Sequence, residues 1–251
     1  IMKLKIILLL TLFISNFSIS QVFFLHGVKI SDENRELFEK IEIKYMSKVA
    51  QDAVDRDLIR GWALLKLEVN EASQRYNYIF VNAFESIEQM NKNFNWWANT
   101  EQVLGIESDV LFRNFFEDSG RYYYKQEMEI ANKRPSKYVA FYFGQAKDVN
   151  AYLNMDKAWM GWHKKNMNST KLNGWGVGTK IYPTNRNQKT NVMSWHLFKN
   201  RDDVMNYVTA QVFMKSAKSF TPFPKVNDTQ TLSNGWENII VGEILSATTP
   251  N

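Results

Sequence analysis

The sequence predicts an α+β fold in which one βαββαβ unit occurs twice along a single chain. Two Gly-Trp pairs first indicate the repeat: Gly61-Trp62 and Gly174-Trp175 lie 113 residues apart, and each separates an amphipathic helical stretch from a strand-like run. The elements around the two pairs also follow the same order. Many of the strand-like runs are apolar on both faces, so both faces of the predicted sheets must be covered.

The first 20 residues are expected to be a signal peptide and not part of the fold. Two lysines give a charged start, residues 6–13 form an apolar run too short to span a bilayer, and the small residues Ser18 and Ser20 stand where a signal peptidase cleaves. We expect cleavage before Gln21 and export to the periplasm or the extracellular space, with an uncleaved anchor as the alternative. No later stretch predicts stable membrane insertion.

Composition narrows the class of protein. At 251 residues, 45% hydrophobic and 14% aromatic, the chain can bury a sizeable core. It has no cysteine, which excludes disulfides, thiolate metal sites and cysteine nucleophiles. Its formal net charge of +5 comes without a block of basic residues, so no nucleic-acid partner is predicted.

The first predicted unit covers residues 21–131. Residues 22–30 read as a strand, and Ser31 or Asp32 can cap the helix that follows. Apolar residues at helical spacing extend this helix to about residue 58, and Gly61 stops it. The remaining elements expected in this unit are strands at 62–69 and 76–84, joined as a hairpin, helices beginning at 85 and at 101, and a strand at 121–130.

The same order returns after a polar linker at 132–136, so the second unit is expected at 137–251. Its predicted elements are a strand at 137–143, a helix at 148–167, strands at 174–182 and 191–198, a helix at 202–215, an irregular stretch at 216–232 and a strand at 235–246. Residues of the two units match at a nearly constant spacing of 114, for example Phe38 with Tyr152. This spacing indicates a tandem duplication.

Each predicted unit has the element order of a ferredoxin-like fold, a four-stranded antiparallel sheet with helices on one face. In the run 76–84, tyrosine and phenylalanine occupy one face, and Ile79, Val81 and Ala83 occupy the other. Helices can cover only one of these faces. We therefore expect the sheets of the two units to pack face to face within one chain.

The chain resembles the dimeric α/β-barrel superfamily in its element order, its duplication and the helix that precedes each Gly-Trp pair. This superfamily includes the stress-responsive Dabb, antibiotic-biosynthesis-monooxygenase-like and EthD-like domains. The resemblance covers nearly all of residues 22–246 and implies that two ferredoxin-like units close a barrel. The chain also resembles uncharacterised exported proteins of Bacteroidetes-type bacteria, in which an aromatic-x-x-x-His step on a helix precedes the Gly-Trp pair. Trp159 and His163 match this step, whereas the first unit has Tyr45 and Val49 instead.

Two of the three histidines are candidates for acid–base chemistry, because imidazole titrates near neutral pH. His196 lies on a predicted strand at the position that Asn82 takes in the first unit, and His163 shares a helix face with Trp159. A structural role in the core is the alternative for both. His26 is expected at a strand edge or on the surface, without a functional role.

Aromatic side chains are the main candidates for ligand binding. Five tryptophans on predicted core elements either pack the core or enclose a flat ligand: Trp62, Trp159, Trp162, Trp175 and Trp195. Asn82 joins them as the counterpart of His196. No histidine or carboxylate motif predicts a metal site, and no cofactor is predicted, with haem as an alternative implied by the resemblance.

These observations favour an exported protein that binds a small apolar or aromatic molecule, as a monomer or a homodimer. Two alternatives stay open. One is a cofactor-independent or haem-linked monooxygenase-like enzyme, which the resemblance implies, and the other is a non-catalytic assembly subunit of the envelope. The sparse titratable groups on the apolar faces do not favour hydrolysis or metal chemistry.

Overall fold

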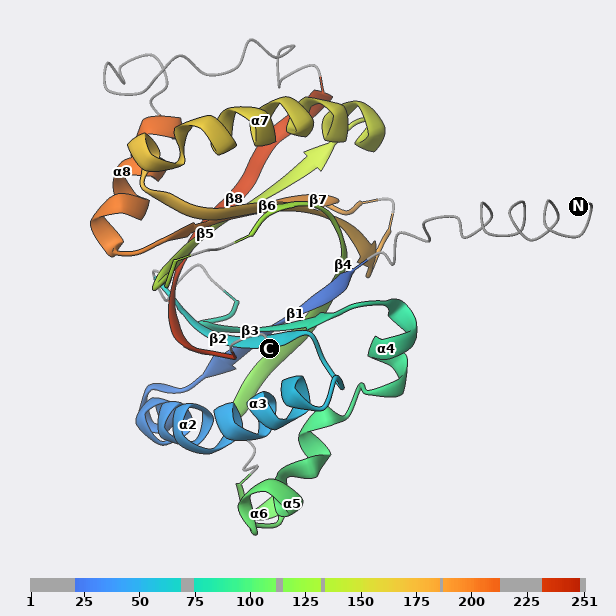
Figure 1. Cartoon of the computed structure of the whole chain (residues 1–251), viewed down its shortest axis with the longest axis vertical. Helices are drawn as coiled ribbons and strands as arrows, with labels where there is room; N and C mark the ends of the chain where they lie inside the picture. Colours follow the sequence, from blue (N-terminus) through green and yellow to red (C-terminus); the bar gives the residue numbers. More distant parts are fainter. Residues whose placement is uncertain are drawn as a thin grey trace, which may run out of the picture.

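The computed structural model describes residues 21–68, 75–111, 115–131, 134–185, 187–212 and 232–248. Within these residues, eight strands close one antiparallel barrel, and helices cover its outside on two opposite sides (Figure 1). The strands are β1 (Val22–Ile30), β2 (Gly61–Leu67), β3 (Tyr78–Phe84), β4 (Phe116–Ile130), β5 (Tyr138–Ala146), β6 (Leu172–Tyr182), β7 (Val192–Phe198) and β8 (Ser233–Ala247). The predicted α+β class and a barrel-like antiparallel sheet are thus confirmed.

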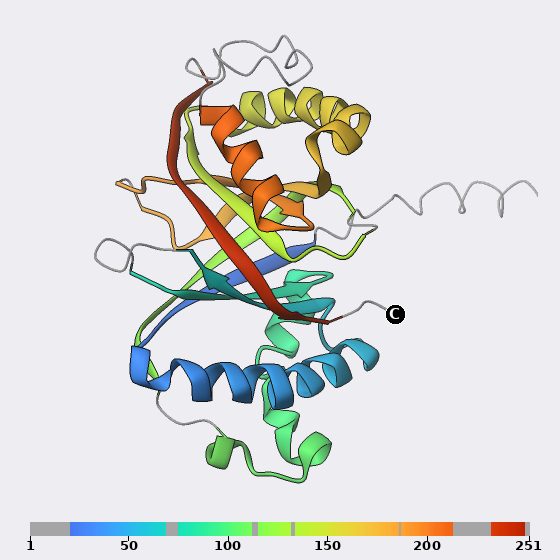
Figure 2. The same cartoon turned by 90° about the vertical axis from the view of Figure 1, so that its left-hand side faces the viewer.

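Around the barrel the strands follow the order β1-β3-β2-β8-β5-β7-β6-β4, and β4 returns to β1. The first half of the chain supplies β1 to β4 and the second half supplies β5 to β8, so the halves meet at two seams, β2 with β8 and β4 with β6. Each seam contains one long strand, β4 or β8, that pairs with a strand of each half. The first part of β4 pairs with β1 and its last part with β6, and β8 passes in the same way from β5 to β2 (Figure 2).

The closure differs from the expected face-to-face packing of two separate sheets. The edge strands of the halves pair with each other, so the described sheet has no open edge and its inner face encloses a common core. The prediction that both strand faces are covered is confirmed. On β3, Tyr78 and Phe80 pack on the helix side, and Ile79 belongs to the cluster inside the barrel.

One long helical stretch covers the outer face of the first half. It runs from a 3₁₀ turn, η2 (Asp32–Asn34), through α2 (Arg35–Ile41) and a π-helix, η3 (Glu42–Met46), to α3 (Ser47–Asp55). Its buried residues keep the predicted helical spacing on either side of the π-helix, among them Phe38 and Val49. The π-helix itself was not predicted, because one added residue changes the apolar spacing very little.

Shorter helices follow β3. They are α4 (Ile87–Lys92), the 3₁₀ turn η4 (Trp96–Asn99), α5 (Thr100–Leu104) and α6 (Ser108–Leu111). Gly105, at φ 67° in the left-handed region, ends α5 and interrupts the helix that the sequence predicts from residue 101. Helices α5 and α6 lie outside α3, away from the barrel (Figure 1).

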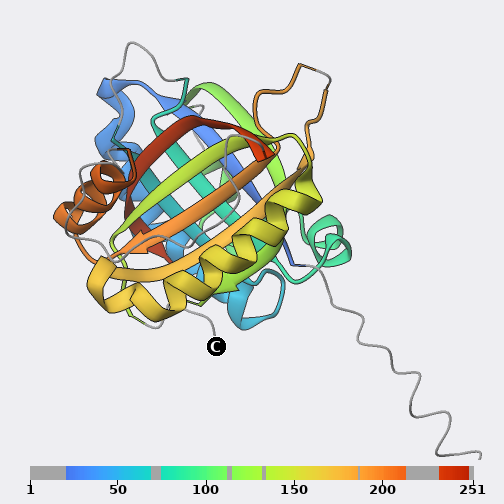
Figure 3. The ribbon, with the colours of Figure 1, turned by 90° about the horizontal axis from the view of Figure 1, so that it is seen from above.

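Among the described residues, two helices cover the second half. Seen from above, α7 (Val149–Thr170) runs along the strands of this half, and α8 (Arg201–Val212) lies beside them (Figure 3). The Asp148 carboxylate accepts hydrogen bonds from the amides of Asn150 and Ala151 and so caps α7. The stretch predicted as irregular, 216–232, lies outside the described residues except for its last position. No helix among the described residues is both long and apolar enough to cross a membrane.

Candidate functional site

The residues predicted to form one site lie at three separate places. The cluster between α7 and the outer face of the second half contains His163, His196, Trp159, Trp162 and Trp175. Trp62 and Asn82 lie on the outer face of the first half, in the wall of a cavity. Trp195 points into the barrel, where its ring packs against Phe23.

The two imidazoles of the second half are packed among aromatic rings. The ring centroids of His163 and His196 are 5.5 Å apart, and that of Trp175 lies 5.1 Å from His163. The hydroxyls of Ser194 and Tyr207 each lie 3.1 Å from a ring nitrogen of His196. Both nitrogens of that imidazole therefore have partners, and the side chains of the two histidines are almost fully buried.

Burial keeps both imidazoles neutral. It lowers the pKa of His163 to about 3. Burial, with a smaller effect of the neighbouring His163, also lowers the pKa of His196 well below its usual value. Groups with such low pKa values are poorly matched to proton transfer near neutral pH. The geometry thus favours a structural role for this cluster, one of the two interpretations that the sequence left open.

A cavity of about 200 Å³ lies between the helices and the sheet of the first half. Aromatic rings form most of its wall: Phe24, Trp62, Phe80, Trp96, Trp97 and Phe116. Three ionisable side chains join them, namely His26, Glu42 and Arg121. A concave, largely apolar cavity with a few convergent polar groups is the usual form of a small-molecule site. We refer to it as the first-half cavity.

The sequence reasoning missed the ionisable groups of this cavity. It placed His26 at a strand edge, whereas β1 is an interior strand that pairs with both β3 and β4. In this register His26 lies opposite Phe80 on one side and Arg121 on the other. The available signal was alternation along β1, which puts His26 on the same face as the core residues Phe24 and Val28.

The strands of the two halves present matching positions. Trp62 pairs with Asn82 across β2 and β3, and Trp175 pairs with His196 across β6 and β7. Asn82 and His196 therefore hold the same place in the two halves, as the sequence predicts. The structure adds that both are buried and hydrogen-bonded.

The π-helix shifts the match between the covering helices by one residue. Glu42 and Asp156, which are 114 positions apart, are both buried. A π-helical turn holds an extra residue, so beyond it the buried positions match at a spacing of 113, which places Ala50 where the second half has His163. The constant spacing used on the sequence instead pairs His163 with Val49, and the structure corrects this by one position.

The two halves differ at the positions that match His163 and His196. Where the second half has these two imidazoles, the first half has the methyl group of Ala50 and the amide of Asn82. The indole N–H of Trp96 donates a hydrogen bond to Asn82 Oδ1 at 3.1 Å and fixes the amide. Asn82 and Trp96 both line the first-half cavity, whereas Ala50 belongs to the buried core.

Burial also sets the protonation states around the cavity. It raises the pKa of Glu42 to about 8, so this carboxyl group is protonated at neutral pH and can donate a hydrogen bond. Burial, followed by the charge of Arg121, lowers the pKa of His26 to about 4, so this imidazole is neutral. The guanidinium carbon of Arg121 lies 6.0 and 5.0 Å from the ring centroids of Phe24 and Phe94. No carboxylate among the described residues forms an ion pair with Arg121.

Comparisons with known proteins show what the fold resembles. No protein-family model and no curated protein matches the sequence. A solved structure of a proposed monooxygenase from Lactobacillus acidophilus NCFM matches with a TM-score of 0.56 and 12% identity, covering 92% of this chain and 97% of that chain. A proposed monooxygenase from Fusobacterium nucleatum subsp. nucleatum ATCC 25586 matches with a TM-score of 0.57 and 9% identity, covering 92% and 94%.

A third structure, a haem-binding protein from Thermus thermophilus, has a TM-score of 0.49 and 10% identity and covers 90% of this chain and 91% of that chain. The two monooxygenase likenesses show a shared fold and no more. At such low identities they carry no information on substrate or reaction.

The described histidines are not placed to ligate a haem. Both nitrogens of His196 are already hydrogen-bonded, and the His163 ring is enclosed by the rings of Trp159, Trp162 and Trp175. The cavity beside His26 holds about 200 Å³, less than a macrocycle of four pyrrole rings needs. Among the same residues, no group of three histidine, aspartate or glutamate side chains could hold a metal ion.

Proposed function

We propose that this protein binds a monocyclic aromatic molecule with a phenol or carboxylate group, and that it does so in the first-half cavity. One observation carries the proposal. Within a largely aromatic wall, the cavity brings together a protonated carboxyl group on Glu42, a neutral imidazole on His26 and a cation on Arg121. Among the described residues the Glu42 carboxyl group has no hydrogen-bond partner, and a ligand in the cavity can offset the cost of its burial.

The volume of the cavity limits the size of the ligand. A dry apolar cavity of about 150 Å³ is known to accept benzene, and this one holds about 200 Å³. A single ring with one or two small substituents therefore fits. The indoles of Trp62 and Trp96 offer flat surfaces on which such a ring can stack.

The polar groups define the substituent. Glu42 and Asn82 can hydrogen-bond an oxygen deep in the cavity, whereas Arg121 is exposed at its mouth. A cation without a carboxylate partner attracts a benzoate or a phenolate and does not favour an aromatic amine. We therefore expect aromatic acids to bind more tightly than their neutral esters.

A second candidate function is a cofactor-independent enzyme of monooxygenase type. The observation in its favour is the pairing of His26 with Arg121 across β1 and β4. A phenol could pass its proton to the neutral imidazole, and the guanidinium would stabilise the phenolate, which is the electron-rich form that reacts with oxygen. A pKa of about 4 makes His26 a weak base, so this function ranks second.

Binding is tested by the fluorescence of the tryptophans in the cavity wall. On titration with 4-hydroxybenzoate we expect a saturable change, and Arg121→Met should weaken binding about fivefold, the effect of losing one partly exposed charge contact. Arg56→Met, which removes an arginine at the end of α3 that is paired with Asp52, should leave binding unchanged. Met46→Trp, which enlarges a side chain in the cavity wall, should abolish binding by filling the cavity, with circular dichroism confirming the fold.

Two outcomes would contradict the proposal. One is equal affinity for 4-hydroxybenzoate and its methyl ester in the wild type and in Arg121→Met. The other is unchanged binding in a folded Met46→Trp protein. Oxygen consumption with the same ligand decides between the two functions: an enzyme loses turnover in His26→Gln while still binding, and a binding protein shows no turnover in either form.

Export and a tandem origin belong to the same proposal. The charged start, the apolar run 6–13 and the small residues before Gln21 support a cleaved signal peptide. The matched strand positions in the two halves support two ferredoxin-like units in tandem, at 21–131 and 137–251. We expect the mature protein to begin at Gln21 and to sediment as a monomer. A retained N-terminus, or a dimer as the smallest species, would contradict these two points.

A further inference from the structure

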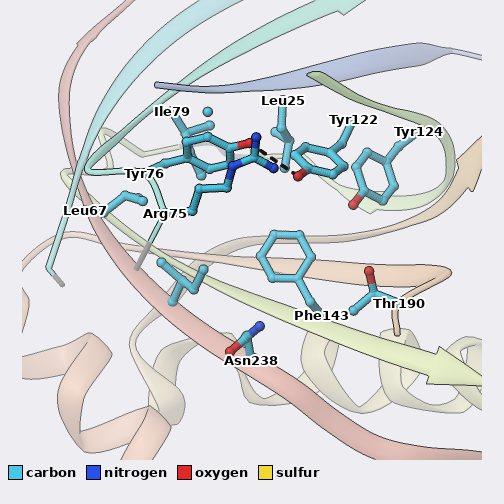
Figure 4. A pocket seen from close by; sticks show the side chains of 12 residues that line it. Leu25, Leu67, Arg75, Tyr76, Ile79, Tyr122, Tyr124, Phe143, Thr190 and Asn238 are labelled. Carbon is cyan, nitrogen blue, oxygen red and sulfur yellow. Dashed lines mark hydrogen bonds between the residues drawn. The ribbon is translucent and has the colours of Figure 1, made fainter. Parts of the chain in front are cut away.

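A second cavity lies inside the barrel, far from the helices that cover the first-half cavity. Its volume is about 480 Å³. In Figure 4, Tyr76, Tyr122 and Tyr124 line one side of this space, and Phe143, Thr190 and Asn238 line the other. Residues of both halves of the chain therefore form its wall. We refer to it as the barrel cavity.

The position of Tyr76 explains why the cavity lies at this end of the barrel. Gly27 and Gly120 are direct partners across β1 and β4, so the inner face of the sheet lacks side chains there. The ring of Tyr76 occupies this bare patch so closely that a Cβ atom on either glycine would collide with it. Toward the other end, Trp195 covers Gly176 and lines a smaller space of about 170 Å³. The larger cavity of the barrel thus lies at the Tyr76 end.

The barrel cavity contains a polar group without a partner. The side chain of Tyr124 is 2% exposed, and its hydroxyl makes no hydrogen bond with the described residues, although it points into the space in Figure 4. A buried hydroxyl without a partner costs free energy unless a ligand or water satisfies it. Close by, the hydroxyls of Tyr76 and Tyr122 lie 3.4 Å apart, so one donates to the other.

A cation stands at the rim of the cavity. The ammonium group of Lys180 lies 5.6 Å from the ring centroid of Tyr122 and donates a hydrogen bond to the carbonyl oxygen of Thr190 at 3.1 Å, and both of these residues line the cavity. Partial burial lowers its pKa, and no carboxylate among the described residues pairs with it. Arg75, in contrast, is held by two hydrogen bonds to Asp118, so its charge is already balanced.

The rest of the wall is aliphatic or aromatic, with Leu25, Leu67, Ile79, Phe143 and Ile240. An apolar space with a hydroxyl inside and one unpaired cation at its rim matches an amphipathic anion. We propose that the barrel cavity is a second binding site, which takes an aliphatic carboxylate with its chain among these apolar side chains and its carboxylate at Lys180 and the tyrosine hydroxyls.

Isothermal titration calorimetry of the mature protein with decanoate tests this site. We expect saturable binding of decanoate and much weaker binding of methyl decanoate and decylamine. Lys180→Met should weaken decanoate binding about tenfold or more, the size of one charge-assisted hydrogen bond, and Lys180→Arg should restore most of it. Lys125→Met removes a lysine on β4 that is already paired with Glu127 and serves as the matched control.

Further variants separate this site from the first-half cavity. Tyr124→Phe should reduce decanoate affinity without affecting 4-hydroxybenzoate, and Met46→Trp should do the reverse. The proposal is overturned if Lys180→Met binds decanoate as well as wild type does, if the methyl ester binds equally well, or if Met46→Trp alone removes decanoate binding. Thermal unfolding of each variant shows that the fold is retained.

Discussion

Replacing Glu42 with glutamine should change the pH dependence of the free energy of unfolding. Burial raises the pKa of this carboxyl group from 4.5 to about 8. In the folded protein it keeps its proton up to about pH 8, whereas the unfolded chain loses that proton near pH 4.5. The unfolded state therefore binds fewer protons in this window, so the stability contributed by Glu42 is present at low pH and is lost as pH rises toward 8.

The size of the effect follows from the same values. One pKa unit corresponds to 1.36 kcal/mol, so between pH 5 and pH 7 the wild type should lose about 2.5 kcal/mol of unfolding free energy relative to Glu42→Gln. Other titrating groups are common to both proteins and cancel in this difference. They include the buried Asp156, whose pKa burial also raises to about 8, and the buried histidines. A pH-independent cost of burying the new amide does not alter the slope.

The assay is urea unfolding followed by circular dichroism, at several pH values between 5 and 8. Glu36→Gln, on the exposed face of α2, is the matched control and should follow the wild type at every pH. If the difference between wild type and Glu42→Gln is the same at pH 5 and pH 7, the carboxyl group is not protonated in the folded state. The chemistry proposed for the first-half cavity would then be refuted as well.

Two further predictions concern packing in the second half and inside the barrel. Gly176→Ala should destabilise the fold by about 1–3 kcal/mol, because the new Cβ collides with the ring of Trp195. Gly161→Ala, with open space around it in α7, should instead stabilise the fold by up to about 1 kcal/mol. Thermal unfolding of the two variants measures both effects, and equal effects would contradict the packing. Tyr207→Phe should lower the free energy of unfolding by about 1–3 kcal/mol, because a buried nitrogen of His196 loses its partner. Urea unfolding measures this change, and an unchanged free energy would show that the contact has no structural role.

Local patterns in the sequence predicted most elements within a few residues. The strand at 22–30 was predicted with the bounds that the structure shows for β1. The last strand of the first half was less well predicted. It begins at Phe116, five residues before the predicted start, because the polar run that follows Phe116 reads as a loop but pairs with β1. Pairing with a neighbouring strand decided this boundary, not the apolar spacing of the segment itself.

The candidate site was predicted only in part. Trp62 and Asn82 could be found from the Gly-Trp repeat and from the match of Asn82 with His196. Glu42 was missed because a glutamate on an amphipathic helix usually faces solvent, although its place four residues after Phe38 puts it on the buried face. The interest in His163 and His196 rested on residue type, on the face of the helix or strand where each lies, and on the match of His163 to the aromatic-x-x-x-His step. The structure adds that both imidazoles are packed among aromatic rings.

By itself, the sequence of this protein determined the order of its elements and the faces of its strands, because apolar spacing is a local property of the chain. Only the tertiary structure decided that the edges of the two halves pair, that Glu42 and Asn82 line one cavity, and that His26 and Arg121 stand side by side. Each of these depends on residues distant in the chain, whose contacts form when the barrel closes. Cavities and shifted pKa values are properties of that closed packing, so no local pattern records them.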